Sequence, residues 1–263
     1  MVLSVHTIVY SQANTGKNPN NKAVKKKKKI DLENPKYPSY FGFQFRPIIP
    51  SSFLGEQVFT TSVNNFSTTF SQKYGYSFGA TIRVGMTKLI AFETGINYNQ
   101  RHFGIDASIA DSGFYEKTTL GFVNYDIPLN ALVYIQLSDK IYANAAMGGM
   151  LSFSPTNVAK HYFVGGVNNF YHSGRLKRKA NFNLNASIGF EYRTEKKGFF
   201  YFGGSAVIPV SPLFYLDSQY RSSVNVLLSS INPVSGSYMT VDLKYFFPNI
   251  KNKGTQFTKG PIE

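Results

Sequence analysis

Hydrophobic and polar residues alternate strictly along several segments of this chain. In residues 74–86, apolar side chains, Tyr and Phe among them, occupy the even positions, whereas Gly, Ser, Thr and Arg occupy the odd ones. Successive side chains of a β-strand point to opposite faces, so this alternation predicts a strand with one apolar and one polar face. Comparable patterns predict eight strands, near residues 40–48, 74–86, 90–101, 123–136, 141–153, 181–193, 199–210 and 239–247.

The residue types on the two faces indicate which face points inward. A soluble barrel of this sequence would bury Arg, Glu and Asn on nearly every strand and expose Phe and Tyr to water. The opposite arrangement, with the apolar face in lipid and the polar face in a lumen, is that of transmembrane β-barrels. No uninterrupted apolar run approaches the roughly 20 residues that a membrane-spanning helix needs, so insertion into a membrane would be by strands.

Short and long connections alternate between the predicted strands. Short turns follow the second, fourth and sixth strands, and loops are expected at 49–73, 106–116, 154–179 and 211–236. Outer-membrane barrels have short periplasmic turns and long external loops, so this order places both termini in the periplasm. The predicted fold is all-β, an eight-stranded antiparallel up-and-down transmembrane β-barrel with short periplasmic turns and long extracellular loops. Within the fourth strand, Pro128 predicts a bulge or kink, because proline cannot donate to the ladder.

The two ends of the chain differ from the strand region. Residues 1–13 are expected to be a truncated signal peptide, since a short apolar stretch ends in Ser-Gln-Ala, with small residues where signal peptidase requires them. Residues 14–38 predict a flexible, basic periplasmic leader. The barrel is expected over 39–247 and a polar tail over 248–263. The net charge is +14, and the positive residues cluster in the leader and in loop 154–179, which is typical of solvated segments rather than of nucleic-acid binding.

The charged residues of the polar face are expected to fill the lumen. Five are positive and four are negative, so they nearly cancel, as a buried network must if no charge is to lack a partner. A structural ion-pair plug is therefore the main interpretation, and a proton or ion path along the same residues is the alternative. The nine residues are Arg46, Arg83, Glu93, Arg101, Asp126, Glu191, Arg193, Asp242 and Lys244.

One long loop combines aromatic and basic residues. At an outer-membrane rim, basic side chains can neutralise lipopolysaccharide phosphates, and aromatic ones can pack on acyl chains or on a protein. The loop is thus a candidate lipid-binding or partner-binding site, and an ordinary polar loop is the alternative. Its candidate residues are His161, Tyr162, Phe163, Phe170, Tyr171, Arg175, Lys177, Arg178 and Lys179.

Few residues suggest catalysis. Cysteine is absent, which excludes disulfides, thiolate zinc sites and a cysteine nucleophile. Beyond His6 in the signal segment, His102, His161 and His172 are expected at the surface, and no histidine has metal-ligand spacing. We therefore expect no catalytic residues, no enzymatic activity, no cofactor and no metal. A lipid-modifying enzyme of the rim is the alternative, and its activity would depend on His102.

Particular segments resemble a known family. They are the end of the signal segment at 11–13, the glycine-punctuated strands 74–79 and 189–192, and the segment 123–129, which reads VNYDIPL. These segments are similar to small outer-membrane β-barrel proteins of Bacteroidota, which include porin-like proteins and the PorT-type barrel of the type IX secretion and gliding system. The resemblance implies a location in the outer membrane of a Gram-negative bacterium, in contact with lipid and lipopolysaccharide.

The expected function follows from the plugged barrel and from this resemblance. It is that of a structural or accessory subunit of an envelope complex, in secretion, gliding or assembly, with protein partners in that complex. A narrow channel for small solutes or ions is the second class of function, and it requires a continuous wet path along the lumen.

Overall fold

The computed structural model describes residues 39–87, 89–111, 113–164, 168–194, 197–221 and 227–248. The expected signal peptide, the leader and nearly all of the C-terminal tail lie outside these residues. No helix in the described part of the chain is long and apolar enough to cross a membrane. In chain order, the elements are β1 (Ser39–Ile49), η1 (Ser52–Leu54), β2 (Val58–Val63), β3 (Phe66–Gly85), β4 (Ile90–Ile109), β5 (Phe114–Gln136), β6 (Ile141–Phe153), β7 (Val158–Val164), β8 (Asn168–Arg175), β9 (Ala180–Thr194), β10 (Gly198–Pro209), β11 (Phe214–Arg221), β12 (Leu227–Val234) and β13 (Tyr238–Phe246).

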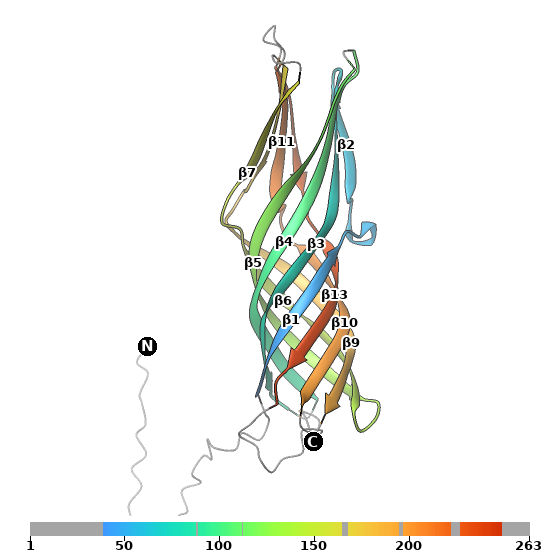
Figure 1. The fold of residues 1–263 in the computed structure, drawn as a ribbon. Helices are drawn as coiled ribbons and strands as arrows, with labels where there is room; N and C mark the ends of the chain where they lie inside the picture. Colours follow the sequence, from blue (N-terminus) through green and yellow to red (C-terminus); the bar gives the residue numbers. More distant parts are fainter. Residues whose placement is uncertain are drawn as a thin grey trace, which may run out of the picture. The chain divides into compact units, whose positions relative to one another are not determined.

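Eight strands are hydrogen-bonded in a closed ring. Its order is β1-β13-β10-β9-β6-β5-β4-β3, and β3 pairs in turn with β1 (Figure 1). Every pairing in the ring is antiparallel. β1 completes the ring, because Phe45 lies opposite Leu243 of β13 on one side and opposite Phe78 of β3 on the other. The all-β antiparallel fold that the alternation predicts is confirmed.

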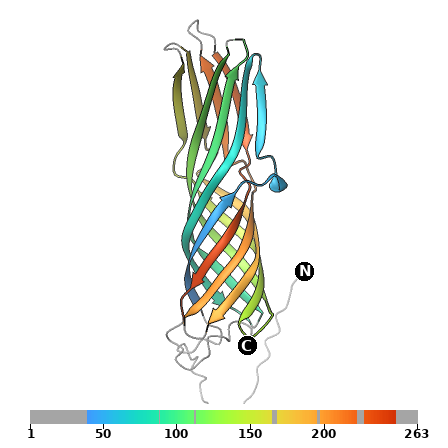
Figure 2. The same ribbon diagram turned by 45° about the vertical axis from the view of Figure 1, so that its right-hand side comes forward.

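A second structure, which we call the cap, continues from one end of the ring. β3, β4 and β5 extend beyond the ring, and β2 pairs with the extended part of β3 (Figure 2). A separate sheet of four strands, with the order β12-β11-β8-β7, lies against them. Two apolar clusters join the two sheets, one around Phe103, Phe122 and Phe214 and the other around Phe66 and Phe170. The cap is therefore a β-sandwich with its own hydrophobic core.

Strand β4 shows how one strand serves both the ring and the cap. Its buried odd-numbered side chains are polar from Glu93 to Arg101 and become apolar from Phe103 to Ile109. The even-numbered positions change in the opposite sense, from Phe, Ile and Tyr in the ring to His, Asp and Ser in the cap. The strand is thus apolar on the outside of the ring and apolar on the inside of the cap. This reversal suits a ring in lipid and a cap in water.

Three of the predicted loops are in fact strands. Loop 49–73 contains β2 and the start of β3, loop 154–179 contains β7 and β8, and loop 211–236 contains β11 and β12. The loop predicted at 106–116 is reduced to the turn between β4 and β5. The described residues therefore form thirteen strands; the eight predicted strands are those of the ring, and the five others, β2, β7, β8, β11 and β12, belong to the cap. Several cap strands were overlooked because Ser, Thr, Asn and Gly, which are common in loops, interrupt their apolar positions.

The bulge predicted as one possibility at Pro128 is not present, although no β4 partner pairs with Ile127 or Pro128. β5 keeps one register with β4 on both sides of this residue, and Pro128 pairs with Met150 of β6. A register shift lies instead in β3, between Lys73 and Tyr76, where β3 passes from the ring into the cap. The extra residue moves the buried positions of β3 from odd numbers in the ring to even numbers in the cap. This bulge lets β3 bury polar residues below it and phenylalanines above it.

Candidate functional site

The end of the ring opposite the cap, which we call the turn end, holds most of the predicted lumen charges. Arg83 contacts two carboxylates, since its Nη2 lies 2.6 Å from Glu93 Oε2 and its Nη1 contacts Glu191 Oε1. Arg193 Nη2 lies 2.8 Å from the other oxygen of Glu191, and Lys244 Nζ contacts Glu93 Oε1. Five buried residues from four strands thus form one continuous ion-pair network inside the ring.

Buried aromatic rings enclose this network. The Arg83 guanidinium lies 4.3 Å from the centroid of the Phe246 ring, and the Arg193 guanidinium lies 4.0 Å from that of Tyr142. Cation–π contacts are strongest where bulk solvent is excluded, as it is around these nearly inaccessible side chains. The sequence analysis did not place Phe246 in the lumen. Its position, two residues after the inward-facing Lys244, was the signal for it.

A second ion pair lies further along the lumen, between β1 and β13. Arg46 Nε lies 3.0 Å from Asp242 Oδ1. The same carboxylate accepts a hydrogen bond from Thr240 Oγ1 at 2.5 Å and one from Ser205 Oγ of β10. Both oxygens of this carboxylate therefore have partners, which lowers the cost of burying its charge.

The remaining two predicted lumen residues, Arg101 and Asp126, are buried but do not pair with each other. Asp126 accepts hydrogen bonds from Ser152 Oγ at 2.5 Å and from the Tyr238 hydroxyl at 3.3 Å. Arg101 Nη2 donates to the carbonyl oxygen of Gly236 at 2.5 Å, and the Arg101 guanidinium lies 4.6 Å from the Tyr238 ring centroid. Tyr238 thus contacts both the cation and the anion, and each of them has neutral partners.

Apolar residues of the cap cover the lumen beyond Arg101. The Arg101 guanidinium lies 5.2 Å from the ring centroid of Phe103, the first residue of the cap core on β4. Phe122 stacks on Phe214 with 4.2 Å between ring centroids, and its ring occupies the space that a side chain at Gly174 would need. The polar lumen therefore ends against a packed aromatic core.

Several polar atoms in the lumen have no hydrogen-bond partner among the described protein residues. They include Arg101 Nε, Arg193 Nη1 and the Tyr134 hydroxyl, together with side-chain amide atoms of several asparagines. Buried polar atoms of this kind are commonly satisfied by ordered water. The lumen, its turn end included, therefore has the polarity to hold ordered water.

The predicted lipid-binding or partner-binding loop is a hairpin of the cap, and its residues do not lie together. Phe170 is buried in the cap core, and the Tyr162 hydroxyl lies 2.5 Å from Thr118 Oγ1. The ring of His161 lies against that of Tyr171, with 4.4 Å between centroids. Phe163 is largely exposed. Arg175, Lys177, Arg178 and Lys179 are exposed near the ring, where β8 connects to β9.

His172 contradicts the prediction of a surface histidine. It is fully buried in the cap, with Nδ1 3.2 Å from Ser218 Oγ and Nε2 3.5 Å from Glu116 Oε2. Burial lowers the pKa of His172 to about 4 and raises the pKa of Glu116. All three side chains are buried, so this group lacks the access to substrate that a hydrolytic triad needs. His102 is only partly exposed, and its Nδ1 lies 3.1 Å from the carbonyl oxygen of Tyr74.

The described residues contain no group of three or more His, Asp or Glu side chains suited to holding a metal ion.

The outer face of the ring is apolar over the height of a bilayer core. Outward residues of β5 are apolar from Tyr125 to Ile135, a stretch of about 34 Å at about 3.4 Å per residue. At a tilt of about 45°, this stretch rises about 24 Å, close to the apolar band of about 25 Å in outer-membrane barrels. At the cap side of this band, the Tyr98 ring lies 5.0 Å from that of Phe78 and 5.8 Å from that of Tyr125, measured between centroids. This row of rings, which we call the girdle, is typical of a membrane–water interface.

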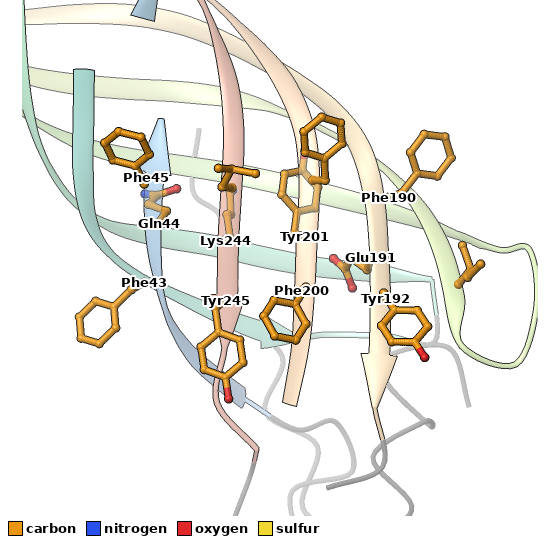
Figure 3. Close-up of a pocket in the computed structure, with 13 residues that line it drawn as sticks. Phe43, Gln44, Phe45, Phe190, Glu191, Tyr192, Phe200, Tyr201, Lys244 and Tyr245 are labelled. Carbon is orange, nitrogen blue, oxygen red and sulfur yellow. The ribbon is translucent and has the colours of Figure 1, made fainter. Parts of the chain in front are cut away.

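An aromatic groove of about 740 Å³ crosses the outer face near the turn end (Figure 3). Rings from β1, β13, β10 and β9 line it, and those of Phe43, Phe200, Tyr192 and Tyr245 project from the wall of the ring. Contiguous apolar surface of this kind on a folded protein marks a contact with a membrane or a partner.

Comparisons with known proteins bear on this architecture. Residues 27–215, more than two thirds of the chain, match the family described as outer membrane protein beta-barrel domain. No curated protein matches the sequence significantly. Among solved structures, the outer membrane protein OprG from Pseudomonas aeruginosa is similar with a TM-score of 0.47 and 9% identity, over 83% of this chain and 100% of that one. The beta domain of the Bordetella autotransporter BrkA is similar with a TM-score of 0.20 and 9% identity, over 80% of this chain and 100% of that one.

Proposed function

The chain belongs to the family of outer membrane proteins with a β-barrel domain, and from this premise we propose that it is a non-conducting anchor that holds a rigid cap outside the outer membrane. The family places the protein in the outer membrane. In the proposal, the eight-stranded ring spans the membrane, the turn end and both chain termini lie in the periplasm, and the cap stands in the extracellular medium.

The reversal of polarity along β4 is the observation that carries this proposal. At a single level, between Arg101 and Phe103, the inside of the strand changes from polar to apolar. The girdle on the outer face begins at Tyr98, close to the same level. A water-soluble sandwich and a lipid-exposed ring require opposite patterns, and this chain has each pattern on the proposed side of the membrane interface.

The filled lumen supports a function without transport. The network around Arg83 and Glu191 is closed off by aromatic rings at the turn end, and the apolar cap core covers the opposite end. Function then resides on surfaces, which a rigid scaffold presents to partners. We therefore assign the protein the role of an accessory or structural subunit of an envelope complex, with lipid, lipopolysaccharide and protein as its partners and without enzymatic activity. The buried Ser218, His172 and Glu116 fit that assignment.

The finer affiliation rests on sequence resemblance. The segment from Val123 to Leu129 and the glycine-punctuated strands are similar to those of small Bacteroidota barrels, including the PorT-type barrel. By this resemblance, we propose a secretion, gliding or assembly machine, with type IX secretion as the specific candidate. The leader and the signal segment, as the sequence analysis describes them, are part of the same proposal.

A narrow channel for small solutes or ions is the second candidate. The observation that favours it is the set of lumen polar atoms without protein partners, such as Arg193 Nη1 and the Tyr134 hydroxyl. A chain of waters along these atoms would provide a conducting path. The anchor proposal denies such a path, because the aromatic rings at the turn end and the cap core interrupt it.

Conductance in planar lipid bilayers distinguishes the two candidates. The full chain should insert and show no discrete conductance steps, and a variant with the cap core opened, Phe122→Ala with Phe214→Ala, serves as the comparison. Folding of both proteins is checked on detergent gels, where a folded barrel changes its electrophoretic mobility when the sample is heated. Reproducible steps from the unmodified protein, altered by Arg193→Met, would overturn the anchor and support the channel.

A further inference from the structure

Basic residues concentrate in one of the connections between ring and cap. We call the five connections together the waist; they are residues 50–57, 154–157, 176–179, 210–213 and 235–237. Segment 176–179 contains Lys177, Arg178 and Lys179, all exposed and without an ion pair among the described residues. Arg175, just before it, is exposed and lies 2.8 Å from Asp217, counted between Nη2 and Oδ2. Three neighbouring cations are thus available to an external anion.

Two hydrogen bonds, one of them to a side chain, hold this connection at a defined place. The amide of Ser154 donates to the carbonyl oxygen of Lys179 at 2.8 Å, and the amide of Leu176 donates to Asn157 Oδ1 at 2.9 Å. Both partners belong to the neighbouring connection of the waist, 154–157. The basic segment therefore lies immediately before β9, at the rim of the ring, and does not extend from a loop tip.

Apolar surface begins directly below the cations. Ala180 pairs with Phe153, and Phe182 pairs with Leu151, on the outer face of β9 and β6. Phe153, Phe182 and Leu151 are all exposed, and the Phe182 ring lies over the space next to Gly149. Three residue steps separate Lys179 from Phe182, about 10 Å along the strand. The three cations and the exposed apolar surface thus lie next to each other on the outside of the ring.

We propose that the segment Lys177, Arg178 and Lys179 binds the phosphates of a phosphorylated, multiply acylated glycolipid of the outer leaflet, whose acyl chains lie against Phe153 and Phe182. This inference rests on the proposed orientation, with the cap outside the cell. Lysine and arginine bind phosphate through charge-assisted hydrogen bonds. Exposed cations with exposed apolar rings directly beneath them favour a lipid over an acidic protein. A water-soluble acidic surface would bind the cations but would make no apolar contact with the rings. The aromatic residues of the loop predicted from the sequence are not part of this lipid site; Phe170, for example, is buried in the cap core.

Native mass spectrometry of the full chain in detergent tests the proposal, with purified diphosphoryl lipid A as the probe. The site variant is Lys177→Gln, Arg178→Gln and Lys179→Gln together. The matched control is Lys117→Gln, Lys140→Gln and Lys197→Gln, which removes the same charge from exposed positions in the cap and at the turn end. At about fivefold per cation near a phosphate, the site variant should bind the lipid about 100-fold more weakly, and the control should bind like the unmodified protein.

Two further probes identify what is recognised. Dephosphorylated lipid A should bind the unmodified protein as weakly as diphosphoryl lipid A binds the site variant. Inorganic phosphate in millimolar excess should not displace the lipid. Equal losses in the site and control variants, equal binding of dephosphorylated lipid, or displacement by inorganic phosphate would each overturn the proposal. Bilayer conductance on the same preparations is a separate readout, so that failure of the anchor and failure of the lipid site are distinguishable.

Discussion

Replacing Glu191 with glutamine tests whether the lumen network is a structural plug. Glu191 is fully buried; one oxygen accepts from Asn144 Nδ2 at 2.7 Å and contacts Arg83, and the other lies 2.8 Å from Arg193 Nη2. Glutamine keeps the shape but removes the charge, which leaves Arg193 without a carboxylate. Removing one partner of a buried ion pair costs about 3–5 kcal/mol, because the other charge stays buried.

The matched control is Asp106→Asn in the cap. Lys117 Nζ lies 3.8 Å from Asp106 Oδ1, and the Lys117 side chain is 63% exposed, so the loss of this pair should cost about 0–1 kcal/mol. Both changes replace a carboxylate with an amide, and they differ in burial.

The assay is urea unfolding in lipid vesicles, followed by circular dichroism because the chain has no tryptophan. With a slope of about 1–3 kcal/mol per molar urea, the midpoint of the Glu191→Gln protein should fall by more than about 1 M relative to the control. Adding Arg193→Met to Glu191→Gln should recover part of the loss, because the unpaired cation is then gone. Equal midpoints for Glu191→Gln and Asp106→Asn would refute a buried, desolvated network.

Three further predictions concern other parts of the molecule. Ile188→Arg on the outer face of the ring should cost about 2–4 kcal/mol in vesicles by the same urea assay, whereas Thr60→Arg on the cap should change the free energy of unfolding by less than about 0.5 kcal/mol; similar values would contradict the assignment of the ring to lipid. Phe122→Ala should remove about 3–5 kcal/mol from the cap and make it sensitive to protease added to whole cells, while unchanged resistance would show that this core is not essential. The low pKa of His172, about 4 against about 6.5 in the unfolded chain, means that its stabilising contribution is complete above pH 6.5 and is lost as the pH falls towards 4. Glu116 has a raised pKa and opposes this by stabilising the fold as it protonates, so His172→Asn should flatten the decline of stability between pH 6.5 and 5, and an unchanged decline would assign it to other groups.

The ring could be predicted from the sequence because a strand between lipid and a polar lumen must alternate strictly between apolar and polar residues. In a strand such as β9, outward Phe182, Leu184 and Ile188 alternate with inward Asn183, Asn185 and Glu191 without interruption. The position of each predicted lumen charge on the polar face was therefore readable from parity alone. The sequence did not show which charges would pair, because pairing depends on which residues of different strands face each other across the lumen. Arg101, for example, contacts Tyr238 of β13 and Gly236 of the connection before β13, and not a carboxylate.

The cap was not predicted, and the reason is physical. Apolar residues such as Phe66, Phe103 and Phe214 are buried inside the cap, but polar and apolar residues mix on both faces of its strands, so no uninterrupted alternation marks them in the sequence. The bulge in β3 hides the continuity further, since Phe66 and Phe70 fall out of phase with Ser77 and Arg83. The burial of His172 was not predicted for the same reason, because a residue assigned to a loop is expected to be solvated.

Strand β5 runs without a break from the ring into the cap, and this continuity has a consequence for what a partner encounters. Residues Phe114 to Asn124 continue the strand beyond the girdle by about 37 Å at about 3.4 Å per residue. The pairings of β3 with β4 and of β4 with β5 occur in both the ring and the cap. Continuous paired strands therefore hold the cap rigidly on the ring, and flexible linkers do not. With the cap outside the cell, as proposed, its tip lies at a constant height above the membrane, so its access to a partner would depend on how deep the sugar layer of neighbouring glycolipids is. A cell with longer surface sugars would bury the same tip without any change in the protein.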